Sequence, residues 1–431
     1  MDIYKCLGIG VGPANLSLAS LLHRHPAVTH LFVDKKPKFT WHDGQQVPGS
    51  ALQVSLFKDL VSLADPTNQF SFVSYLHAGG KLYHFLNAQF ENVPRQEFRN
   101  YLQWASERNS NVAFGEEVLS IDFTDRFRIR TSTRTVLADN VVIGVGNTPY
   151  VPPAAHGKLG ATQFHVSEFL KKACCLAGKR VAVVGGGQSG AEAFLDLVAR
   201  PAKELPRQVA WVSRRRNYLP IDDSPFTNDF FMPCYSDYFY ALDSKARSTF
   251  LKDHLLASDG ISEATLRAIY QNIYTHRFIN GATDLVALYP NRAVMQIEGS
   301  TNGWELTLRH NDKPDLISLL RADVVIWATG FQAVRMDFLA PIADRLEMKE
   351  SEYCIDEDFA VPWDGPADRQ IFMQNASRRQ RGLADPNLSL LAWRSQRILD
   401  RLLGSRSTPQ LPSFIQWNGH GGELASEFEG V

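Results

Sequence analysis

Two glycine-rich turns, each placed between a buried-strand pattern and a helical pattern, constrain the fold of this chain more than any other feature. The flanking patterns lie at residues 3–9 and 16–22 for the first turn, and at 180–184 and 191–198 for the second. Strand, glycine turn and helix in this order open a βαβ nucleotide-binding unit. The sequence therefore predicts an α/β protein with two Rossmann-like dinucleotide-binding domains.

The first turn has the chemistry of a pyrophosphate site. Gly10 and Gly12 are followed by Pro13 at the start of the predicted helix. Glycines let the backbone N–H groups of a helix N-terminus approach a phosphate closely. Asn15 occupies the third position, where glycine or alanine is usual, and so loosens the match. Asp34 ends the next apolar run, about 20 residues after Gly12, where an acid binds the ribose hydroxyls of an adenosine.

The second turn matches the fingerprint fully and differs from the first in the strand after it. Its residues are Gly185, Gly187, Gln188, Ser189 and Gly190. The next apolar strand ends in Ser213, Arg214 and Arg215, with Arg216 behind them, and carries no acid. Guanidinium and hydroxyl groups suit a 2′-phosphate, which an acid would repel. The two units together predict FAD and NADPH as cofactors, with hydride passing from nicotinamide to flavin.

The length of 431 residues allows two or three domains. The predicted division is an FAD-binding domain at 1–160 and 318–431, an NADPH-binding domain at 161–221 and 286–317, and a small helical substrate-binding region at 222–285. The 45 basic and 46 acidic residues give no reason to expect a nucleic-acid partner. No apolar run is long enough for a transmembrane segment, no targeting segment is recognisable, and the five cysteines form no metal-site or disulfide pattern, so we expect no metal and a cytoplasmic location.

Two enzyme classes are excluded by residue patterns. A flavin disulfide reductase needs a closely spaced cysteine pair, and Cys6 is the one cysteine before residue 174. The segment 187–191 nearly matches the G-x-S-x-G turn of serine hydrolases, but its last glycine is missing and Ser189 lies inside the nucleotide fingerprint. Flavin-dependent oxygenation, a simple reductase and a non-catalytic NADPH-binding protein remain.

Several strings, in order along the chain, resemble the microbial N-hydroxylating flavoprotein monooxygenases of siderophore biosynthesis, the lysine N6-hydroxylase branch above all. The resemblance covers about residues 5–418. The strings are GVGPANLS (10–17), FTWH (39–42), QVSLFKDLV (53–61), PTN (66–68), VVGGGQSG (183–190), WVSRR (211–215), DDSPFTN (222–228), ATGF (328–331) and ADPNLSLLAWRS (384–395).

The resemblance implies a reaction. NADPH reduces FAD, O2 adds to the reduced flavin to give a C4a-hydroperoxide, and a neutral primary amine attacks the distal oxygen to become a hydroxylamine. The bound NADP⁺ protects the hydroperoxide, and the site must exclude water. No protein nucleophile is required, so no side chain is assigned a certain catalytic role.

The resemblance also implies site residues. Gln53 should lie near the flavin ring and NADP⁺, with Trp41 and His42 beside the flavin. Lys58 and Asn228 should hold the end of the substrate away from the reacting amine. The remaining matches are Thr329 and Gly330 for the cofactor, Asn272 for the substrate, and Ser389 for both.

Two departures from related patterns stand out. Arg381 replaces a histidine common in relatives, which predicts extra positive charge near the flavin or the substrate entrance. Leu159 and Ala161 replace the leading residues of the motif typical of flavin monooxygenases that oxidise sulfides and ketones, which disfavours S-oxidation or a Baeyer–Villiger reaction. The expected substrate is a small aliphatic diamine or diamino acid: L-lysine, cadaverine or putrescine, with ornithine's chain length unsettled. Relatives suggest a homo-oligomer, a dimer or a tetramer.

Overall fold

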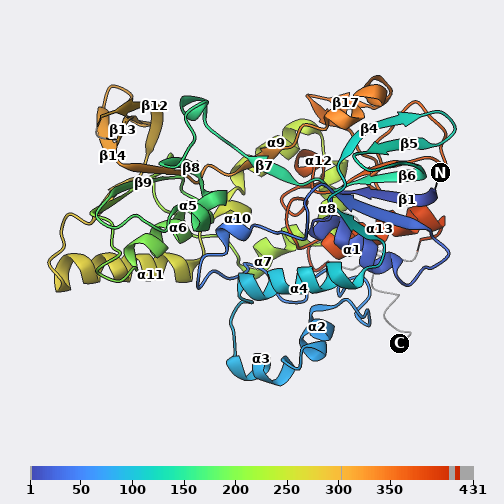
Figure 1. Ribbon diagram of the computed structural model, residues 1–431, viewed down its shortest axis with the longest axis horizontal. Coiled ribbons are helices and arrows are strands. Elements are labelled where there is room, and N and C mark those ends of the chain that lie inside the picture. The colour runs from blue at the N-terminus through green and yellow to red at the C-terminus, as the bar shows by residue number, and fades with distance from the viewer. Residues whose placement is uncertain (1, 302, 407–412, 418–431) are drawn as a thin grey trace.

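The computed structural model describes residues 2–301, 303–406 and 413–417. Two large sheets, one mixed and one parallel, lie side by side along the long axis of the molecule (Figure 1). We call the part around the sheet that carries Gly10 the first unit, and the part around the sheet that carries Gly185 the second unit. In the described ranges, no helix is both long and apolar enough to cross a membrane.

The first unit is built on a mixed sheet. Strands β3, β2, β1 and β6 are parallel to one another, β5 and β4 continue antiparallel, and β19 pairs in parallel with the end of β6. The strands are β1 (Ile3–Ile9), β2 (His30–Asp34), β3 (Val112–Phe114), β4 (Val118–Phe123), β5 (Phe127–Thr131), β6 (Thr135–Ile143) and β19 (Ile371–Met373). The last four residues of β1 and of β6 and all of β2 and β19 are buried, as expected of parallel strands covered on both faces.

Helices cover this sheet on one side (Figure 1). Helix α1 packs against both α4 and α13, and α2 and α3 extend from the same side. Their bounds are α1 (Pro13–Leu22), α2 (Phe72–Ala78), α3 (Leu82–Ala88), α4 (Arg95–Arg108) and α13 (Leu391–Leu403). A 3₁₀ segment, Asp337–Arg345, lies against β4, followed by the short pair β17 (Met348–Lys349) and β18 (Glu352–Tyr353).

The second unit has three layers. Its central sheet is fully parallel, in the order β11, β10, β9, β15, β8. Alternate residues of β9 face opposite layers: Val181 and Val183 pack with α6 and α11, and Ala182 and Val184 pack with an antiparallel sheet of β12, β13 and β14. The elements are α5 (Phe169–Lys172), α6 (Gln188–Val198), α11 (Glu263–Tyr274), β8 (Gln163–His165), β9 (Arg180–Val184), β10 (Gln208–Val212), β11 (Val286–Tyr289), β12 (Arg292–Ser300), β13 (Gly303–His310), β14 (Ile317–Ala322) and β15 (Val324–Trp327).

A two-stranded ribbon joins the units. Strand β7 (Asn147–Pro149) leaves β6 of the first sheet, and β16 (Phe331–Ala333) leaves β15 of the second, and the two pair antiparallel. Figure 1 shows β7 running between the two halves of the molecule.

The α/β class and both strand–turn–helix units are confirmed, while the strand pairing shifts one predicted boundary. Strands β14 and β15 lie in the second unit, although the predicted FAD domain resumes at residue 318. Local apolar runs do not reveal which of two sheets a strand joins, so this boundary lies after Trp327. The run at 141–146 is a strand as far as Ile143.

The segment 222–285 is largely helical, as predicted, but its helices contact two different neighbours. Helices α8 and α9 contact α12 (Arg378–Arg381), whereas α11 packs on α6 of the second unit. The helices are α7 (Pro225–Asn228), α8 (Pro233–Ala241), α9 (Ser244–Asp253) and α10 (Leu256–Asp259), followed by α11. A single substrate-binding region over this range therefore stays a prediction.

Candidate active site between the two units

The first glycine turn is shaped by one crowded position and one open position. Gly10 has φ +88°, and a Cβ there would lie 2.6 Å from the carbonyl oxygen of Gly144. Gly12 caps the N-terminus of α1, and a Cβ there would meet no atom within 4 Å. Pro13 occupies the first helical turn, where its missing N–H is not needed. The open face at Gly12 is where a phosphate can approach the helix N-terminus.

Asp34 is 7% exposed, and its carboxylate forms hydrogen bonds to the first glycine turn and to the end of β2. One carboxylate oxygen accepts from the N–H of Val11 at 2.8 Å, and the other accepts from the N–H of Lys36 at 2.9 Å. Each oxygen retains a further lone pair for a ribose hydroxyl. The carboxylate thus holds the turn and the end of β2 in register.

Asn15 points into the protein, away from the open face. Its side chain is fully buried, and its Nδ2 lies within 3.3 Å of the carbonyl oxygens of Ile9, Gly10 and Val142. Its Oδ1 accepts from Gln374 at 2.8 Å. Asn15 therefore ties β1 to β6 beneath the turn, and its side chain cannot contact a phosphate at Gly12.

The network beneath Asn15 continues through a buried ion pair. Gln374 accepts from Arg394 at 3.3 Å, and Arg394 donates at 2.8 Å to Asp385, with both side chains of that pair 1% exposed. Asp385 also accepts from the N–H of Ser377. This network connects the first glycine turn to the loop that leads to Ser389.

The second glycine turn repeats the design. Gly185 has φ +146°, and a Cβ there would lie 2.0 Å from the carbonyl oxygen of Ala328. A Cβ at Gly190 would lie 2.4 Å from the carbonyl oxygen of Gly185, so only glycine allows α6 to pack this close. Gly187 caps α6, and the nearest atom to a Cβ there is 3.8 Å away. The helix N-terminus is again open at the second glycine.

The three arginines after β10 have different partners. Arg215 donates to the carbonyl oxygen of Gly186 at 2.9 Å, and burial lowers its pKa. Arg216 forms an exposed ion pair with Asp312 at 3.1 Å. Arg214 is exposed and forms no ion pair within the described ranges, which leaves it available to an anion. Ser213 is buried, and its hydroxyl accepts from the N–H of Arg215.

The predicted flavin-side residues lie close to the ribbon between the units. The ring of His42 is 5.8 Å from that of Phe331 and 5.1 Å from that of Trp41. Burial, with Arg95 nearby, lowers the pKa of His42 and so favours the neutral imidazole. The Thr329 hydroxyl donates to the carbonyl oxygen of Tyr150 at 2.5 Å, and the carbonyl of Gly330 accepts from the N–H of Tyr150 at 2.9 Å.

Lys58 and Ser389, two of the predicted substrate residues, lie in contact. The Lys58 Nζ donates to Ser389 Oγ at 3.1 Å and lies 5.7 Å above the ring of Phe231. Burial lowers the pKa of Lys58, and within the described ranges no carboxylate lies within 4.0 Å of its ammonium. A partly buried cation with a hydroxyl and an aromatic ring beside it is arranged to bind an anion.

The loop carrying Lys58 is held by the residue next to it. Asp59 is 1% exposed and accepts from the N–H groups of Val61, Ser62 and Phe72 at 2.6–2.9 Å. Burial raises the pKa of Asp59 despite these bonds. With Asp59 turned inward, its neighbour Lys58 faces Ser389.

The other two predicted substrate residues are not joined to Lys58. Asn228 is exposed at the end of α7 and donates to the carbonyl oxygen of Asp223 at 2.9 Å. Asn272 lies on α11 and donates to the carbonyl oxygen of Ala268 in its own helix. Within the described residues neither amide contacts Lys58 or Ser389, so the roles of Asn228 and Asn272 stay predictions.

The expectation for Arg381 is wrong. Its side chain is 1% exposed and paired with Asp237 at 2.8 Å, and it also donates to the carbonyl oxygen of Glu357. Its guanidinium lies 4.3 Å from the ring centre of Tyr240. Arg381 thus ties α12 to α8 and adds no exposed charge at an entrance, because its guanidinium is enclosed and paired with Asp237, a carboxylate that it shares with Arg397.

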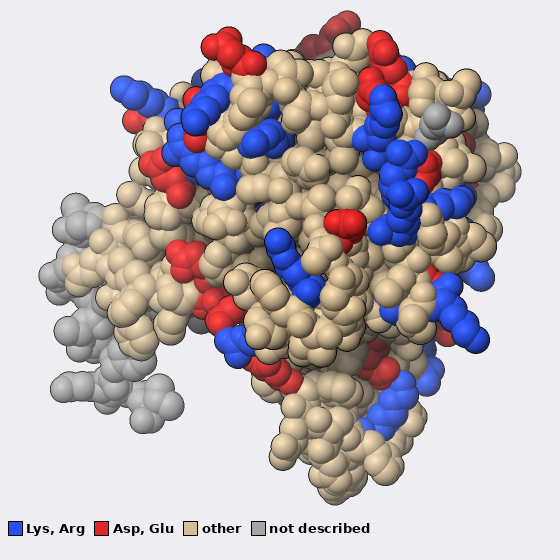
Figure 2. All heavy atoms as spheres, turned by 90° about the vertical axis from the view of Figure 1, so that its left-hand side faces the viewer, with Lys and Arg blue, Asp and Glu red and all other residues tan. Residues whose placement is uncertain are grey.

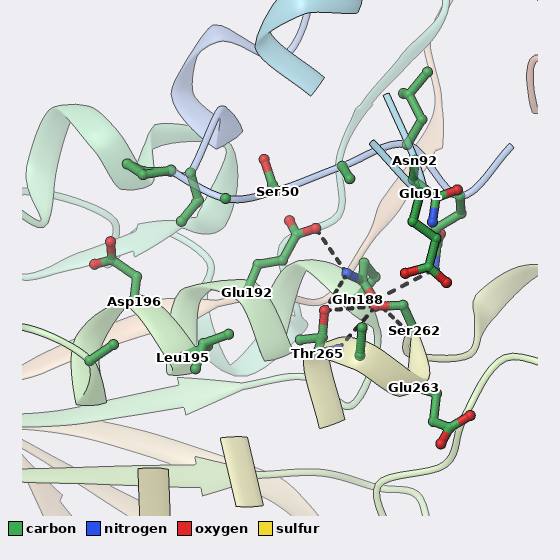
Figure 3. Close-up of a pocket in the computed structure, with 18 of the residues that line it drawn as sticks. Ser50, Glu91, Asn92, Gln188, Glu192, Leu195, Asp196, Ser262, Glu263 and Thr265 are labelled. Carbon is green, nitrogen blue, oxygen red and sulfur yellow. Dashed lines mark hydrogen bonds between the residues drawn. The ribbon is translucent and has the colours of Figure 1, made fainter. Parts of the chain in front are cut away.

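A cleft of about 1250 Å³ lies where the first unit meets α6 and α11. Gln53 contributes from the first unit, and Gln188, Glu192, Ser262 and Thr265 contribute from the second. Figure 3 shows Gln188 at the centre of hydrogen bonds with Glu192, Thr265 and Ser262. Gln53 Nε2 lies 3.5 Å from Gln188 Oε1, so the two predicted cofactor residues do approach each other.

One further contact, which the sequence did not reveal, links the units beside this cleft. Arg95 on α4 and Glu192 on α6 form a double hydrogen bond at 2.8 and 2.9 Å. Neither residue belongs to a recognisable string. The sequence could have indicated Glu192, because it lies four residues after Gln188 and therefore on the same face of the predicted helix.

Comparison with known proteins identifies the family. The model of the L-lysine 6-monooxygenase/L-ornithine 5-monooxygenase family matches residues 2–333. The chain belongs to this family. It is an N-hydroxylating flavin monooxygenase of siderophore biosynthesis.

Its relatives differ in the substrate that their names give. The L-lysine N6-monooxygenase of Escherichia coli is 39% identical, with 95% of this chain and 97% of that protein covered. A cadaverine monooxygenase of desferrioxamine biosynthesis from Erwinia amylovora, solved with FAD, superposes with a TM-score of 0.89 at 26% identity, covering 96% of this chain and 99% of the other. An ornithine N-hydroxylase from Kutzneria, solved with reduced FAD, NADP⁺ and L-ornithine, gives a TM-score of 0.86 at 28% identity, covering 94% and 99%.

Proposed function

We propose that this monooxygenase hydroxylates the side-chain amine of L-lysine, with FAD at the first glycine turn, NADPH at the second and O2 as co-substrate. The observation that carries the choice of substrate is the partly buried ammonium of Lys58. It has the Ser389 hydroxyl at 3.1 Å and, within the described residues, no acidic partner. An α-carboxylate supplies the missing charge.

Electrostatics separates lysine from cadaverine at this position. Two unit charges about 4 Å apart interact by about 4 kcal/mol at the effective dielectric constant typical near a protein surface. A carboxylate beside Lys58 gains from this interaction, whereas the second ammonium of cadaverine or putrescine is repelled. The identity to the lysine enzyme of E. coli, 39% over nearly the whole chain, supports the same choice.

The two glycine turns fit the two cofactors. Gly12 and Gly187 both cap a helix and both leave the space above the helix N-terminus open. At the first turn Asp34 suits the ribose hydroxyls of FAD, and at the second Arg214 suits the 2′-phosphate of NADPH. When bound, the nicotinamide supplies hydride and the flavin supplies activated oxygen.

The remaining work belongs to the chain itself. Lys58 and Ser389 anchor the carboxylate end, so the side-chain amine is presented at a fixed distance from them. The side-chain amine reacts in its neutral form. An acidic group beside this amine would raise its pKa and keep it protonated, so the site must bind the distant carboxylate without placing a negative charge near the amine. Chain length then separates lysine from ornithine.

The deciding experiment measures hydroxylamine formation, with NADPH and O2, on lysine, ornithine, cadaverine and putrescine in parallel. We expect the highest kcat/KM with lysine, and H2O2 as the main product without a substrate. A higher kcat/KM with cadaverine or putrescine overturns the choice of lysine. Hydroxylamine from none of the four overturns N-hydroxylation of a small amine altogether.

A further inference from the structure

Arg95 and Glu192 join the two units by a bidentate ion pair, one helical turn from the second glycine turn. Arg95 begins α4 of the first unit, and Glu192 lies one turn into α6 of the second. Their side chains are 16% and 6% exposed, and the two nitrogen–oxygen distances are 2.8 and 2.9 Å. A bidentate guanidinium–carboxylate pair fixes direction as well as distance.

On the first unit, Arg95 is rigidly connected to the segment that carries Gln53. The N–H of Arg95 donates to the carbonyl oxygen of Ser50, and the N–H of Leu52 donates to that of Val93, both at 2.9 Å. Arg95 also reaches the carbonyl oxygen of Gln45 at 3.4 Å. A displacement of Arg95 therefore displaces Gln53.

On the second unit, Glu192 orients the first residue of the nucleotide-binding helix. Its carboxylate accepts from Gln188 Nε2 at 2.9 Å, one helical turn back. This leaves Gln188 Oε1 to accept from the N–H of Ser262 at 2.8 Å and to face Gln53 Nε2 at 3.5 Å. Figure 3 shows Glu192 directed at Gln188 on the wall of the cleft. The helix N-terminus at Gly187 is thereby tied to the ion pair.

Other contacts join the units beside this pair. The ribbon of β7 and β16 is three residue pairs long. At Gly44 the two units approach closely, because a Cβ there would lie 1.9 Å from the carbonyl oxygen of Ser167. Gln45 Nε2 adds one bond to Ser189 Oγ at 3.3 Å. Arg95 also reaches Gln45, so the ion pair adds a bidentate charged bond of fixed direction to this contact.

We infer that Arg95 and Glu192 are positioning residues for hydride transfer: their ion pair sets the angle between the units so that the nicotinamide of an NADPH whose pyrophosphate lies at Gly187 reaches the flavin of the first unit. The inference rests on the two-cofactor part of the proposed function and not on the choice of amine. Neither side chain contacts a reacting atom. Both act through Gln53 and Gln188.

The test compares Arg95→Met and Glu192→Gln in the FAD-loaded protein. The matched control is Arg134→Met, because Arg134 makes the same double bond to Glu116, 6% exposed, entirely inside the first unit. Three quantities are measured without any amine: the rate of flavin reduction at saturating NADPH, the NADP⁺ dissociation constant by calorimetry, and the melting temperature.

Each single variant at the interface should reduce the flavin about tenfold more slowly or worse, because displacements of about 1 Å at a reacting pair cost factors of this size. NADP⁺ should bind more weakly, since the anchor at Gln188 is loosened. Arg134→Met should lower the melting temperature by a similar amount and leave the reduction rate near that of the wild type.

Reduction rates in Arg95→Met equal to those in Arg134→Met overturn the inference. If Arg95→Met does not fold, Arg95→Lys keeps the charge without the bidentate geometry, and wild-type reduction in that variant overturns the inference too. A wild-type protein whose flavin NADPH reduces, but which hydroxylates no amine, refutes the proposed substrate alone.

Discussion

Lys58 and Ser389, 331 residues apart in the chain, are joined by a 3.1 Å hydrogen bond from Nζ to Oγ. The bond brings a loop after α1 together with the loop before α13. Asp59 holds the first loop from within, and the buried pair of Arg394 and Asp385 holds the second. Both loops that position the Lys58 ammonium are therefore held by buried contacts. Within the described residues the ammonium still lacks an acidic partner.

Replacing Lys58 should discriminate between substrates. Lys58→Met should raise the KM for lysine roughly 10- to 100-fold, because this factor corresponds to the free energy of a hydrogen bond to a charged group. Cadaverine has no carboxylate to lose, so its KM should stay the same or fall. Steady-state kinetics on both amines checks this, with the exposed Lys349→Met as control. An equal rise for both amines would place Lys58 outside the carboxylate site.

The pH profile should carry the same signature. Burial lowers the pKa of Lys58, so its ammonium is charged below that lowered pKa and neutral above it. As pH rises through this lowered pKa, Lys58 loses its charge and no longer binds the carboxylate. The kcat/KM for the substrate L-lysine should therefore fall at a lower pH than it would if Lys58 had the pKa of an exposed lysine side chain. Lys58→Arg should remove this alkaline fall, because guanidinium stays charged. Cadaverine, measured over the same range, should show no such fall, and an identical fall with both amines contradicts the assignment.

Arg214 and Arg216 should differ in their effect on NADPH. Arg214 is exposed and without an ion pair in the described part of the chain, whereas Arg216 is engaged by Asp312. Arg214→Ala should raise the KM for NADPH about tenfold or more, in line with the loss of a charge-assisted hydrogen bond, and leave that for NADH unchanged. Arg216→Ala is the matched control and should have the smaller effect. If Arg214→Ala changes the KM for NADPH and the KM for NADH equally, Arg214 does not bind the 2′-phosphate.

Restoring the usual glycine at position 15 should harm the protein. The Asn15 side chain is fully buried and serves carbonyl groups of β1 and β6 as well as Gln374. Asn15→Gly removes the buried hydrogen bonds that Nδ2 and Oδ1 make to these groups, and should cost about 2–4 kcal/mol in the free energy of unfolding. Urea unfolding of the FAD-loaded protein measures it, and Asn15→Ala should fall in the same range. A neutral result would show that the glycine fingerprint, and not the network, governs this position.

The charge balance of the sequence also has a structural counterpart. Figure 2 shows the end of the molecule formed by the second unit, where basic and acidic side chains are both spread over the face. Arg180 with Asp323, Arg216 with Asp312 and Arg321 with Glu305 are among the ion pairs of this unit. Such pairing agrees with the near-zero net charge of the sequence.

Local sequence patterns were sufficient for both nucleotide units. Gly10 and Gly185 have positive φ, and Gly12 and Gly187 cap their helices, as the spacing predicted. These features depend on steric and hydrogen-bonding rules that act within a few residues, and those rules are visible in the sequence. The resemblance added Lys58 and Ser389, which the structure brings into contact.

The tertiary structure alone decided the rest. The sequence pattern places Asn15 at the third position of a phosphate-binding turn, but in the fold its buried side chain connects strands β1 and β6. Arg381, expected as an entrance charge, is enclosed by Asp237 and Tyr240. The pairing of Arg95 with Glu192 joins residues 97 apart that share no local pattern. Whether a polar side chain meets solvent, a ligand or a buried partner depends on which distant surface packs over it. The sequence by itself determined the two glycine turns, whose conformation depends on neighbouring residues, whereas the burial and the partners of the charged groups around them followed from packing.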